Sequence, residues 1–299
     1  MSASDQLAGT ASVVPVPAIA KARGRRSRHL LPGFGLTLGV SMLYVTIIIV
    51  LPLLAMLLKV SGMGFEEFWR IVASNRSLAA YRITFSSALI ATVFNGITGL
   101  LLAWVLTRYT FPGKRILDAL VDLPFALPTA VAGLVLVTLF ARTGWYGQFL
   151  EPNGWKVNYT QVGIIIAMTF TSIPFVVRTV QPVLEDIQVD LEEAATTLGA
   201  TRWQIFTRVI WPTILPAFMA GCVLSFARSL GEFGAVVFIA GNLPGFTEIV
   251  SLLIYIRLDE YNYQGAAALA SVLLLVAFLT LLATNALQAW QVRYADRTR

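Results

Sequence analysis

Long apolar segments alternate with short polar connections along this chain. Six segments reach the length of about 20 residues that a helix needs to cross a bilayer. They run approximately over residues 36–58, 83–107, 117–141, 161–180, 213–240 and 266–289. This pattern predicts an all-α integral membrane protein with six transmembrane helices. The fifth segment is the least uniform of the six, because it contains Arg228 and Glu232.

The connections carry patterns of their own. Residues 62–82 mix aromatic and acidic side chains, which favours an amphipathic helix at the membrane interface. Residues 142–159 contain two Trp and two Tyr, the side chains that gather at membrane–water interfaces. Residues 241–265 begin with a Gly- and Pro-containing turn and continue into an apolar run, which predicts a re-entrant or interfacial helix.

Composition supports a membrane location. Of the 299 residues 57% are hydrophobic and 13% are charged, and the mean hydropathy is +0.74. A soluble domain carries about a quarter charged residues. The net charge of +6 is explained by the positive-inside rule better than by nucleic acid. With the N-terminus inside, fourteen Lys and Arg lie on the inner side and seven on the outer side. We therefore expect both termini in the cytoplasm.

The first 31 residues form a separate region. They are rich in small residues and end in a basic cluster, so we expect a largely disordered cytoplasmic tail. Residues 32–299 form the transmembrane domain. The first apolar segment is longer than the core of a cleavable signal peptide, so we interpret it as a span. Cys222 and His29 are the single cysteine and histidine, which excludes an intrachain disulfide and argues against a metal site.

The connection between the fourth and fifth segments, at about residues 181–213, has a distinctive spacing. Glu193, Ala194 and Ala195 are followed by Gly199 and then by Pro212. The two alanines favour a helix and permit close approach of another surface. Gly199 can end that helix in a left-handed conformation, and Pro212 is tolerated in the first turn of the next helix. The spacing predicts a short helix, a turn and a second short helix.

This stretch resembles the EAA loop of bacterial ATP-binding-cassette (ABC) importer permeases, Glu-Ala-Ala-x₃-Gly-x₉-Ile-x-Leu-Pro. Val209 replaces the Ile and Trp211 the Leu, both apolar for apolar. The resemblance implies the type I importer permease fold, which is similar to that of MetI. It also implies that Glu193, Ala194, Ala195, Gly199 and Pro212 couple the chain to a cytoplasmic ATPase. The alternative is an ordinary amphipathic loop.

Three further stretches narrow the resemblance to the sulfate/thiosulfate permeases, and to their T-type subunit. They are residues 121–133, residues 174–184, and residues 225–244 with Arg-Ser-Leu-Gly-Glu-Phe-Gly followed by Phe-Ile-Ala-Gly-Asn-Leu-Pro. The resemblance implies a bacterial inner-membrane subunit that works with a W-type permease, two ATPase subunits and a periplasmic sulfate-binding protein. It implies no cofactor in this chain, since ATP and Mg²⁺ belong to the ATPase. The chain has no phosphate-binding Gly-x₄-Gly-Lys-Ser/Thr loop.

Arg228 and Glu232 are four residues apart, on one face of the fifth segment. Charges inside a bilayer are costly, so each needs a partner or a water-filled cavity. One interpretation places the pair at the translocation pathway or its gate, where Arg228 offsets the charge of an oxyanion. The other is a self-neutralising pair that fixes packing. Glu232 argues against a simple anion site, because it would repel sulfate.

Other residues are given structural interpretations. Pro124, Pro128 and Pro174 are expected to bend their helices as packing adaptations. Asp122 is expected to cap a helix or to pair with Lys114 or Arg115. Gly96, Gly99 and Gly221 are expected to permit close helix contact.

Three other functions stay open on the sequence. A molybdate or tungstate ABC permease would share much of the Arg-Ser-Leu-Gly-Glu-Phe-Gly pattern. A single-chain secondary anion transporter would show inverted repeats and paired broken helices, which are not apparent. An intramembrane enzyme would need a nucleophile with a base, or metal ligands, within the spans, and an Arg–Glu pair supplies neither. The sequence therefore predicts a permease subunit and no enzyme.

Overall fold

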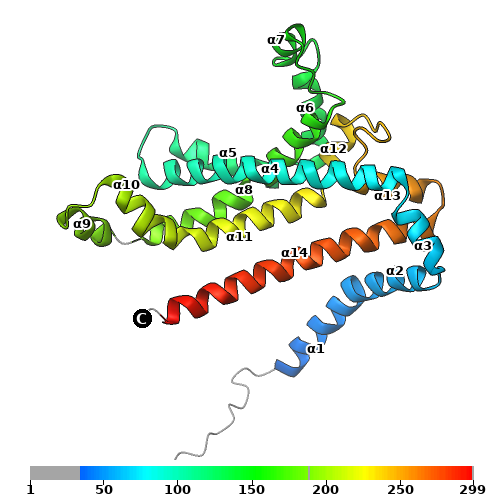
Figure 1. Ribbon diagram of the computed structural model, residues 1–299, viewed down its shortest axis with the longest axis horizontal. Coiled ribbons are helices and arrows are strands. Elements are labelled where there is room, and N and C mark those ends of the chain that lie inside the picture. The colour runs from blue at the N-terminus through cyan, green and yellow to red at the C-terminus, as the bar shows by residue number, and fades with distance from the viewer. Residues whose placement is uncertain (1–33, 188, 298–299) are drawn as a thin grey trace, which may run out of the picture. The chain divides into compact units, whose positions relative to one another are not determined.

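The computed structural model describes residues 34–187 and 189–297, and these are helical with short connections (Figure 1). By their internal contacts they divide into two units, residues up to Leu53 and residues from Leu54 onward, and each is described by itself. The predicted basic tail over residues 1–31, with His29, lies outside the described residues.

The first unit is helical from Phe34. It contains α1 (Phe34–Val45), a π-helical turn (Thr46–Val50) and the start of α2 (Leu51–Ser61). With the rest of α2 they make one apolar helix of 28 residues, Phe34–Ser61, which confirms the first predicted span. The π turn lies just before Pro52, whose missing N–H breaks the regular hydrogen-bond ladder. The apolar side chains of this helix are exposed on all of its faces, as expected for a helix in contact with lipid or protein in a membrane.

Three long helices form the centre of the second unit. They are α4 (Asn75–Arg108), α8 (Gln161–Asp186) and α11 (Trp211–Leu230), and they pack side by side (Figure 1). Gly99 of α4 lies against Val176 of α8, and Gly221 of α11 lies against Val176 and Thr179. A β-carbon on Gly99 would meet Val176 Cβ at 2.9 Å. The interpretation of these glycines as packing positions is therefore confirmed.

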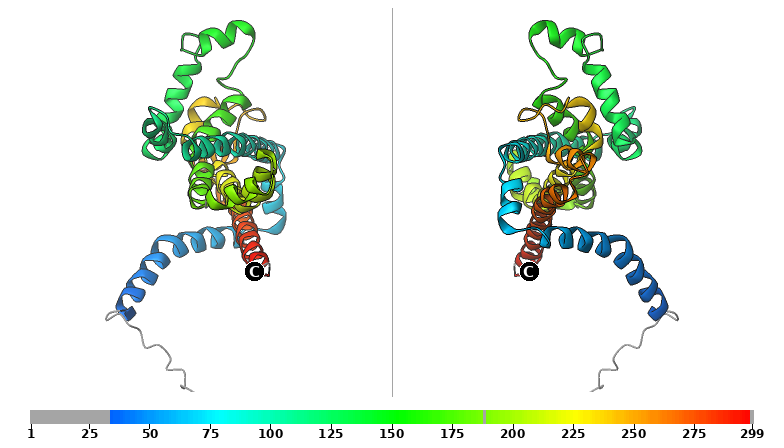
Figure 2. Two further views of the ribbon diagram at one scale, coloured as in Figure 1. Left: turned by 90° about the vertical axis from the view of Figure 1, so that its left-hand side faces the viewer. Right: turned by 90° about the vertical axis from the view of Figure 1, so that its right-hand side faces the viewer.

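The third predicted span is not one straight helix. It consists of α5 (Lys114–Ala126) and α6 (Thr129–Phe140), which meet at an angle of 113°. The break falls at Leu127, whose backbone is extended (φ −86°, ψ 134°) because Pro128 follows it. Figure 2 shows α6 rising away from the bundle of α4, α8 and α11. Pro124, by contrast, lies inside α5.

The fifth predicted span also has different ends in the structure. Its helix starts earlier, because α10 (Arg202–Ile205) runs through a π-helical turn (Phe206–Ile210) into α11, giving one apolar helix Arg202–Leu230. It ends at Leu230 rather than at residue 240. Residues 231–233 leave the helix, and a new short helix, α12 (Gly234–Ile239), begins with its Ala235 N–H bonded to the Glu232 carboxylate at 2.9 Å.

The remaining helices complete the second unit. They are α3 (Phe65–Val72), α7 (Gly147–Leu150), a 3₁₀ turn (Glu151–Asn153), α9 (Val189–Thr197), α13 (Val250–Asp259) and α14 (Tyr263–Arg297). The predicted interfacial helix at residues 62–82 is confirmed only as α3, since residues 75–82 begin α4. The predicted helix within residues 241–265 is α13.

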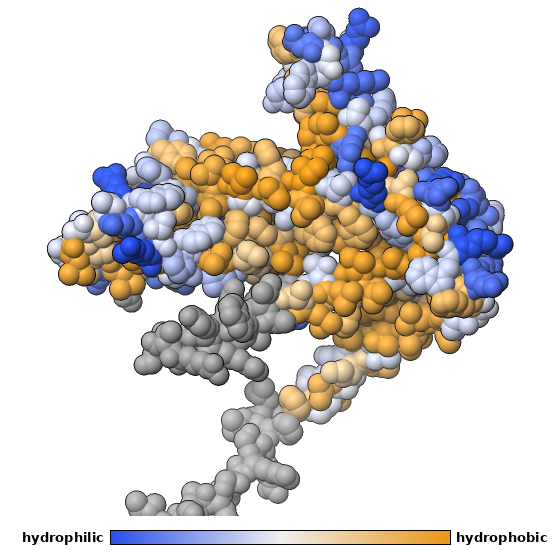
Figure 3. Space-filling view, viewed as in Figure 1, coloured by the Kyte–Doolittle hydropathy of each residue, from blue (hydrophilic) through white to orange (hydrophobic). Residues whose placement is uncertain are grey.

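Five helices in the described part of the chain are long and apolar enough to cross a membrane, and six if the bent pair counts as one span. The all-α class and the number of spans are therefore confirmed. Figure 3 shows apolar residues over the flanks of the α4 bundle, and hydrophilic residues near α9 and near α13. The bundle therefore has an apolar middle between two polar ends.

Candidate coupling and pathway sites

The residues of the EAA segment form a helix, a turn and a second helix, as the spacing predicts. Glu193, Ala194 and Ala195 lie on α9. Gly199 follows with φ +81°, a left-handed conformation that glycine adopts without strain. Thr201 then caps α10, accepting from the Gln204 N–H at 3.3 Å while its own N–H donates to the Gln204 side chain at 2.8 Å. This reciprocal capping fixes where the second helix starts.

The turn between α9 and α10 exposes large apolar side chains. Leu198 is 88% exposed and Trp203 is 71% exposed, and Glu193 is exposed as well. Beside them is a hollow of about 390 Å³, whose lining includes Ala195, Gly199 and Ile205. Two exposed apolar side chains around a hollow are typical of a surface that receives another protein.

An ion pair ties this segment to the long helix α4. Glu192 on α9 pairs with Arg108 at the end of α4. The guanidinium of Arg108 also lies over the ring of Trp104, 5.4 Å from its centroid, and Trp104 contacts Phe206 edge-on at 5.7 Å. Both side chains of the ion pair are about a quarter exposed or less, so the pair is partly shielded from water. The EAA segment is therefore braced against the bundle while its tip stays exposed.

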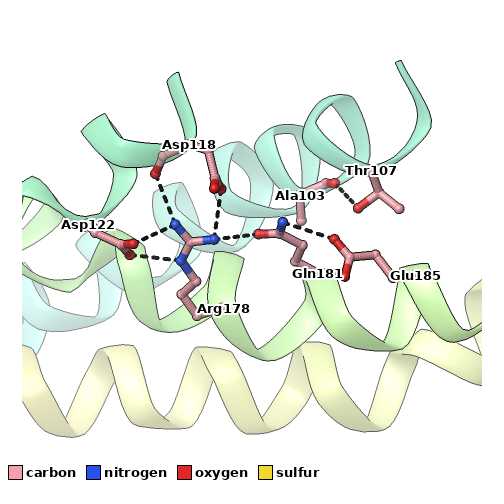
Figure 4. Close-up of polar contacts among 7 residues, drawn as sticks. All are labelled: Ala103, Thr107, Asp118, Asp122, Arg178, Gln181 and Glu185. Carbon is pink, nitrogen blue, oxygen red and sulfur yellow. Dashed lines mark hydrogen bonds and ion pairs between the residues drawn. The ribbon is translucent and has the colours of Figure 1, made fainter. Parts of the chain in front are cut away.

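A second group of charges joins α5 to α8 (Figure 4). Arg178 binds both carboxylate oxygens of Asp122 at 2.8 and 2.7 Å, and the carboxylate and backbone oxygen of Asp118 at 2.8 and 2.9 Å. It also donates to Gln181 at 2.8 Å. Asp122 therefore pairs with Arg178, and the prediction of a helix cap or a pair with Lys114 or Arg115 was wrong.

Arg228 and Glu232 form the predicted ion pair, with Nη1 and Oε2 2.7 Å apart. Glu232 is 1% exposed, and its other oxygen accepts the Ala235 N–H that starts α12. Its backbone carbonyl accepts the Ser251 hydroxyl at 2.8 Å. Glu232 thus holds three elements together, whereas the Arg228 side chain stays 32% exposed. The structure gives Glu232 a packing role and leaves Arg228 accessible on one side.

A polar cluster lies deep between α4, α8 and α11. The Asn95 side-chain amide donates to Ser172 at 2.8 Å, to Ser225 at 3.2 Å and to the Thr169 carbonyl at 3.3 Å. Ser172 in turn is 3.1 Å from the Ser229 hydroxyl. Gln161 meets Ser86 as Ser172 meets Asn95, so α4 and α8 run in the same direction. Ser229 meets Ser172 while Gly221 meets Thr179, so α11 runs against them, as alternate membrane crossings require.

The two candidate sites lie at opposite ends of one helix. Pro212, exposed at the start of α11, follows the π-helical turn that absorbs its missing N–H. From Arg202 to Leu230 the helix has 29 residues and is about 40 Å long. Arg228 and Glu232 are at its far end. One continuous helix therefore joins the EAA segment to the end of the bundle that carries this ion pair.

Sequence reasoning missed several pairs that the fold brings together. Arg108 with Glu192, Arg178 with Asp118 and Asp122, and Arg76 with Glu248 join residues far apart in the chain. A charged or amide side chain within an apolar segment was the available signal at Arg178 and at Asn95. No local spacing indicates which residue each of them reaches.

The whole arrangement defines a transport permease, and similarity to known proteins agrees. Residues 95–295 match the family described as "binding-protein-dependent transport system inner membrane component", and the chain belongs to this family. Solved structures share the fold. A bacterial ABC transporter involved in the import of alginate superposes with a TM-score of 0.72 over 85% of this chain and 94% of that chain, at 20% identity. The methionine transporter MetNI gives 0.55 over 77% and 99%, at 21% identity.

Within the family, sulfate permeases are highly similar to this chain. The sulfate transport system permease protein CysT of Escherichia coli K12 is 55% identical over 88% of this chain and 95% of that protein. CysT of Synechocystis is 48% identical over 86% and 90%. The resemblance to sulfate permeases and to the type I importer fold is thereby confirmed. The chain is an inner-membrane permease subunit of an ABC importer.

Proposed function

We propose that this chain forms half of the membrane pathway of an ATP-driven importer for sulfate and thiosulfate. The substrate is proposed from the relatives, which are described as sulfate permeases and match 88% and 86% of the chain. A related W-type permease would form the other half. A periplasmic sulfate-binding protein would deliver the anion, and two ATPase subunits would bind ATP and Mg²⁺. Both termini would lie in the cytoplasm.

We further propose that the segment from Glu193 to Pro212 receives the force of the ATPase. The observation that carries this proposal is the exposed turn around Gly199, joined without a break to the helix Arg202–Leu230. The exposed side chains of Leu198 and Trp203 supply the apolar contact, and the Glu193 carboxylate is free to pair with a basic residue of the ATPase. ATPase closure would push this turn and tilt α11, so that access to the pathway alternates.

An uptake assay with the reconstituted complex tests transport and coupling together. The chain is co-expressed with its W-type partner, tagged ATPase and binding protein, and the purified complex is placed in vesicles containing ATP. We expect binding-protein-dependent uptake of radioactive sulfate, with thiosulfate as a competitor. A complex that takes up molybdate but not sulfate would overturn the substrate proposal and leave the coupling proposal standing.

Gly199→Trp tests the coupling contact. A bulky residue in the turn should remove the ATPase from the purified complex, because the docking surface is blocked. Gly154→Trp is the matched control, since Gly154 has φ +82°, lies equally open and is outside the EAA segment. We expect the control to retain the ATPase. Equal ATPase recovery with both variants would contradict the proposed docking site.

A further inference from the structure

A hollow of about 490 Å³ lies at the end of α4 that is remote from the EAA segment. One face of α4 lines it with Leu78, Ala79, Arg82, Ile83 and Ser86, and Gln161, Gly245 and Phe246 close it from α8 and from the loop before α13. The polar side chains that line it, among the residues that the structure describes, are one guanidinium, one hydroxyl and one amide, with no carboxylate. The hollow therefore carries a net positive charge.

Arg82 is the origin of that charge. Within the described residues it forms no ion pair and no hydrogen bond, although other arginines of this side do. Arg76 binds the buried carboxylate of Glu248 through two hydrogen bonds of 2.9 and 2.6 Å. Glu248 is the carboxylate nearest in sequence to the Gly245–Phe246 wall, and Arg76 already neutralises it. The five N–H donors of Arg82 are left available to a ligand.

Two neutral polar side chains stand beside Arg82, and the Ser86 hydroxyl donates to the Ile83 carbonyl at 3.2 Å, so the guanidinium is the donor that a ligand would meet. The Gln161 amide reaches the Ser86 hydroxyl at 2.8 Å and the Ser87 hydroxyl at 3.2 Å, so these side chains form one small polar wall. Gln161 is the first residue of α8, and the side chain of the preceding Thr160 caps none of the α8 amides. The positive end of the α8 dipole therefore adds to the field of the guanidinium.

The position of the hollow relates it to transport. Arg82 and Arg108 are 26 residues apart on the same helix, which is about 39 Å. Arg108 holds the EAA segment, so Arg82 lies across the membrane from the proposed ATPase contact. We infer that the Arg82 hollow is an entry site for the transported oxyanion, which a tetrahedral dianion occupies transiently after release from the binding protein. This inference rests on the proposed function.

The chemistry of the hollow favours a hydrated, weakly held anion. Its volume is in the range of pockets for drug-sized ligands, of about 300–1,000 Å³, and far exceeds that of one tetrahedral oxyanion. The anion would keep part of its water shell and meet Arg82 through planar, charge-assisted hydrogen bonds. Conduction needs binding that is favourable enough for entry and weak enough for departure. A single guanidinium in an open hollow meets both conditions.

Arg82→Gln is the central variant, tested in vesicles with saturating sulfate-loaded binding protein and internal ATP. We expect sulfate uptake to fall about tenfold, the loss that follows from removing one charge-assisted contact. ATP hydrolysis stimulated by the binding protein should stay at the wild-type rate, because Arg82 touches neither the ATPase nor the EAA segment. Arg82→Lys keeps the charge without the planar fork and should recover part of the uptake.

Arg142→Gln is the matched control, because Arg142 is also exposed on the outer side and lies outside the hollow. We expect its uptake to equal the wild type. Equal uptake by Arg82→Gln would overturn the inference and leave the proposed function intact. Loss of binding-protein-stimulated ATP hydrolysis in Arg82→Gln would also overturn it, since Arg82 would then be a docking contact for a protein carboxylate. A wild-type complex that hydrolyses ATP without sulfate uptake would overturn the proposed function and this inference with it.

Discussion

At the scale of single residues, Arg178 is the side chain that fixes α5 against α8. Its guanidinium makes five hydrogen bonds, to Asp118, Asp122 and Gln181. The planar fork of arginine matches a carboxylate in a way that the point charge of lysine cannot. Because the side chain is 30% exposed, water screens part of this interaction. The cluster is nonetheless the main polar link between these two helices.

We expect Arg178→Ala to lower the free energy of unfolding by about 2 kcal/mol, since two carboxylates lose their partner. Arg178→Lys should lose about half as much, because the charge stays and the fork is lost. Labelling of Cys222 by a thiol-reactive dye during heating measures this in the purified chain, because Cys222 is the single cysteine and is half-buried. Arg115→Ala on α5, which removes an exposed arginine, should leave the apparent melting temperature unchanged; an equal drop would contradict the role of the cluster.

The contacts of the Glu232 carboxylate give a second prediction at this scale. Its carboxylate combines the ion pair with Arg228 and the hydrogen bond from Ala235 that starts α12. Glu232→Gln keeps an acceptor for the Ala235 N–H and loses the charge, whereas Glu232→Ala loses both. We expect the alanine variant to be the less stable by about 1 kcal/mol, the typical value of a helix cap. The same dye-labelling melt measures the order of the two variants, and equal melting temperatures would contradict the capping role.

The sequence predicted the contact between Arg228 and Glu232 but not the partners of Arg178, for a physical reason. Arg228 and Glu232 lie four residues apart on a helix, so their contact follows from local geometry alone. The partners of Arg178 lie on another helix, 56 and 60 residues earlier in the chain. Which helices pack together is decided by the whole fold, so Asp122 could not be paired correctly from spacing.

At the scale of elements, proline and glycine decide where the helices bend and how closely they pack. Pro128 breaks the third predicted span, because the residue before a proline avoids the helical conformation. Glu232 starts a new helix within the fifth predicted span by capping it. Hydropathy does not locate the first break, since apolar residues continue through it, and at the second break Glu232 alone interrupts a segment that stays apolar on average. Hydropathy therefore predicted the number of spans correctly but not their bends.

The close packing of α8 and α11 gives a prediction for this scale. A β-carbon on Gly221 would lie 3.0 Å from the Val176 Cα and would overlap the Thr179 hydroxyl, so the two helix backbones must separate. We expect Gly221→Ala to destabilise the chain by about 1–3 kcal/mol, the usual cost of overpacking. The dye-labelling melt would show an earlier transition.

Gly39→Ala is the control for that substitution. Gly39 is helical, and a β-carbon there would meet nothing within 4 Å. Alanine is the better helix former, so this variant should melt no earlier than the wild type. If Gly221→Ala behaved like Gly39→Ala, the contact between α8 and α11 would be looser than the structure shows.

At the scale of the whole molecule, the directions of the helices and the distribution of Lys and Arg together predict how the bundle is oriented in the membrane. Gln161 lies at Ser86 and Ser172 lies at Asn95, which fixes α4 and α8 as parallel. Ser229 lies at Ser172 and Gly221 lies at Thr179, which fixes α11 as antiparallel to them. The EAA turn and the Trp155 loop therefore lie at opposite ends of this bundle. The excess of Lys and Arg assigns the EAA end to the cytoplasm.

This orientation is tested by two single cysteines introduced after Cys222→Ser. Leu198→Cys marks the EAA turn and Trp155→Cys the opposite loop, and both positions are at least 70% exposed, so a reagent on the correct side can reach them. In spheroplasts a membrane-impermeant thiol reagent should label Trp155→Cys and spare Leu198→Cys. Inverted vesicles stripped of the ATPase should show the reverse, and rebinding the ATPase should protect Leu198→Cys. Labelling of Leu198→Cys in spheroplasts would place the EAA turn outside the cell, where no ATP-driven subunit could reach it.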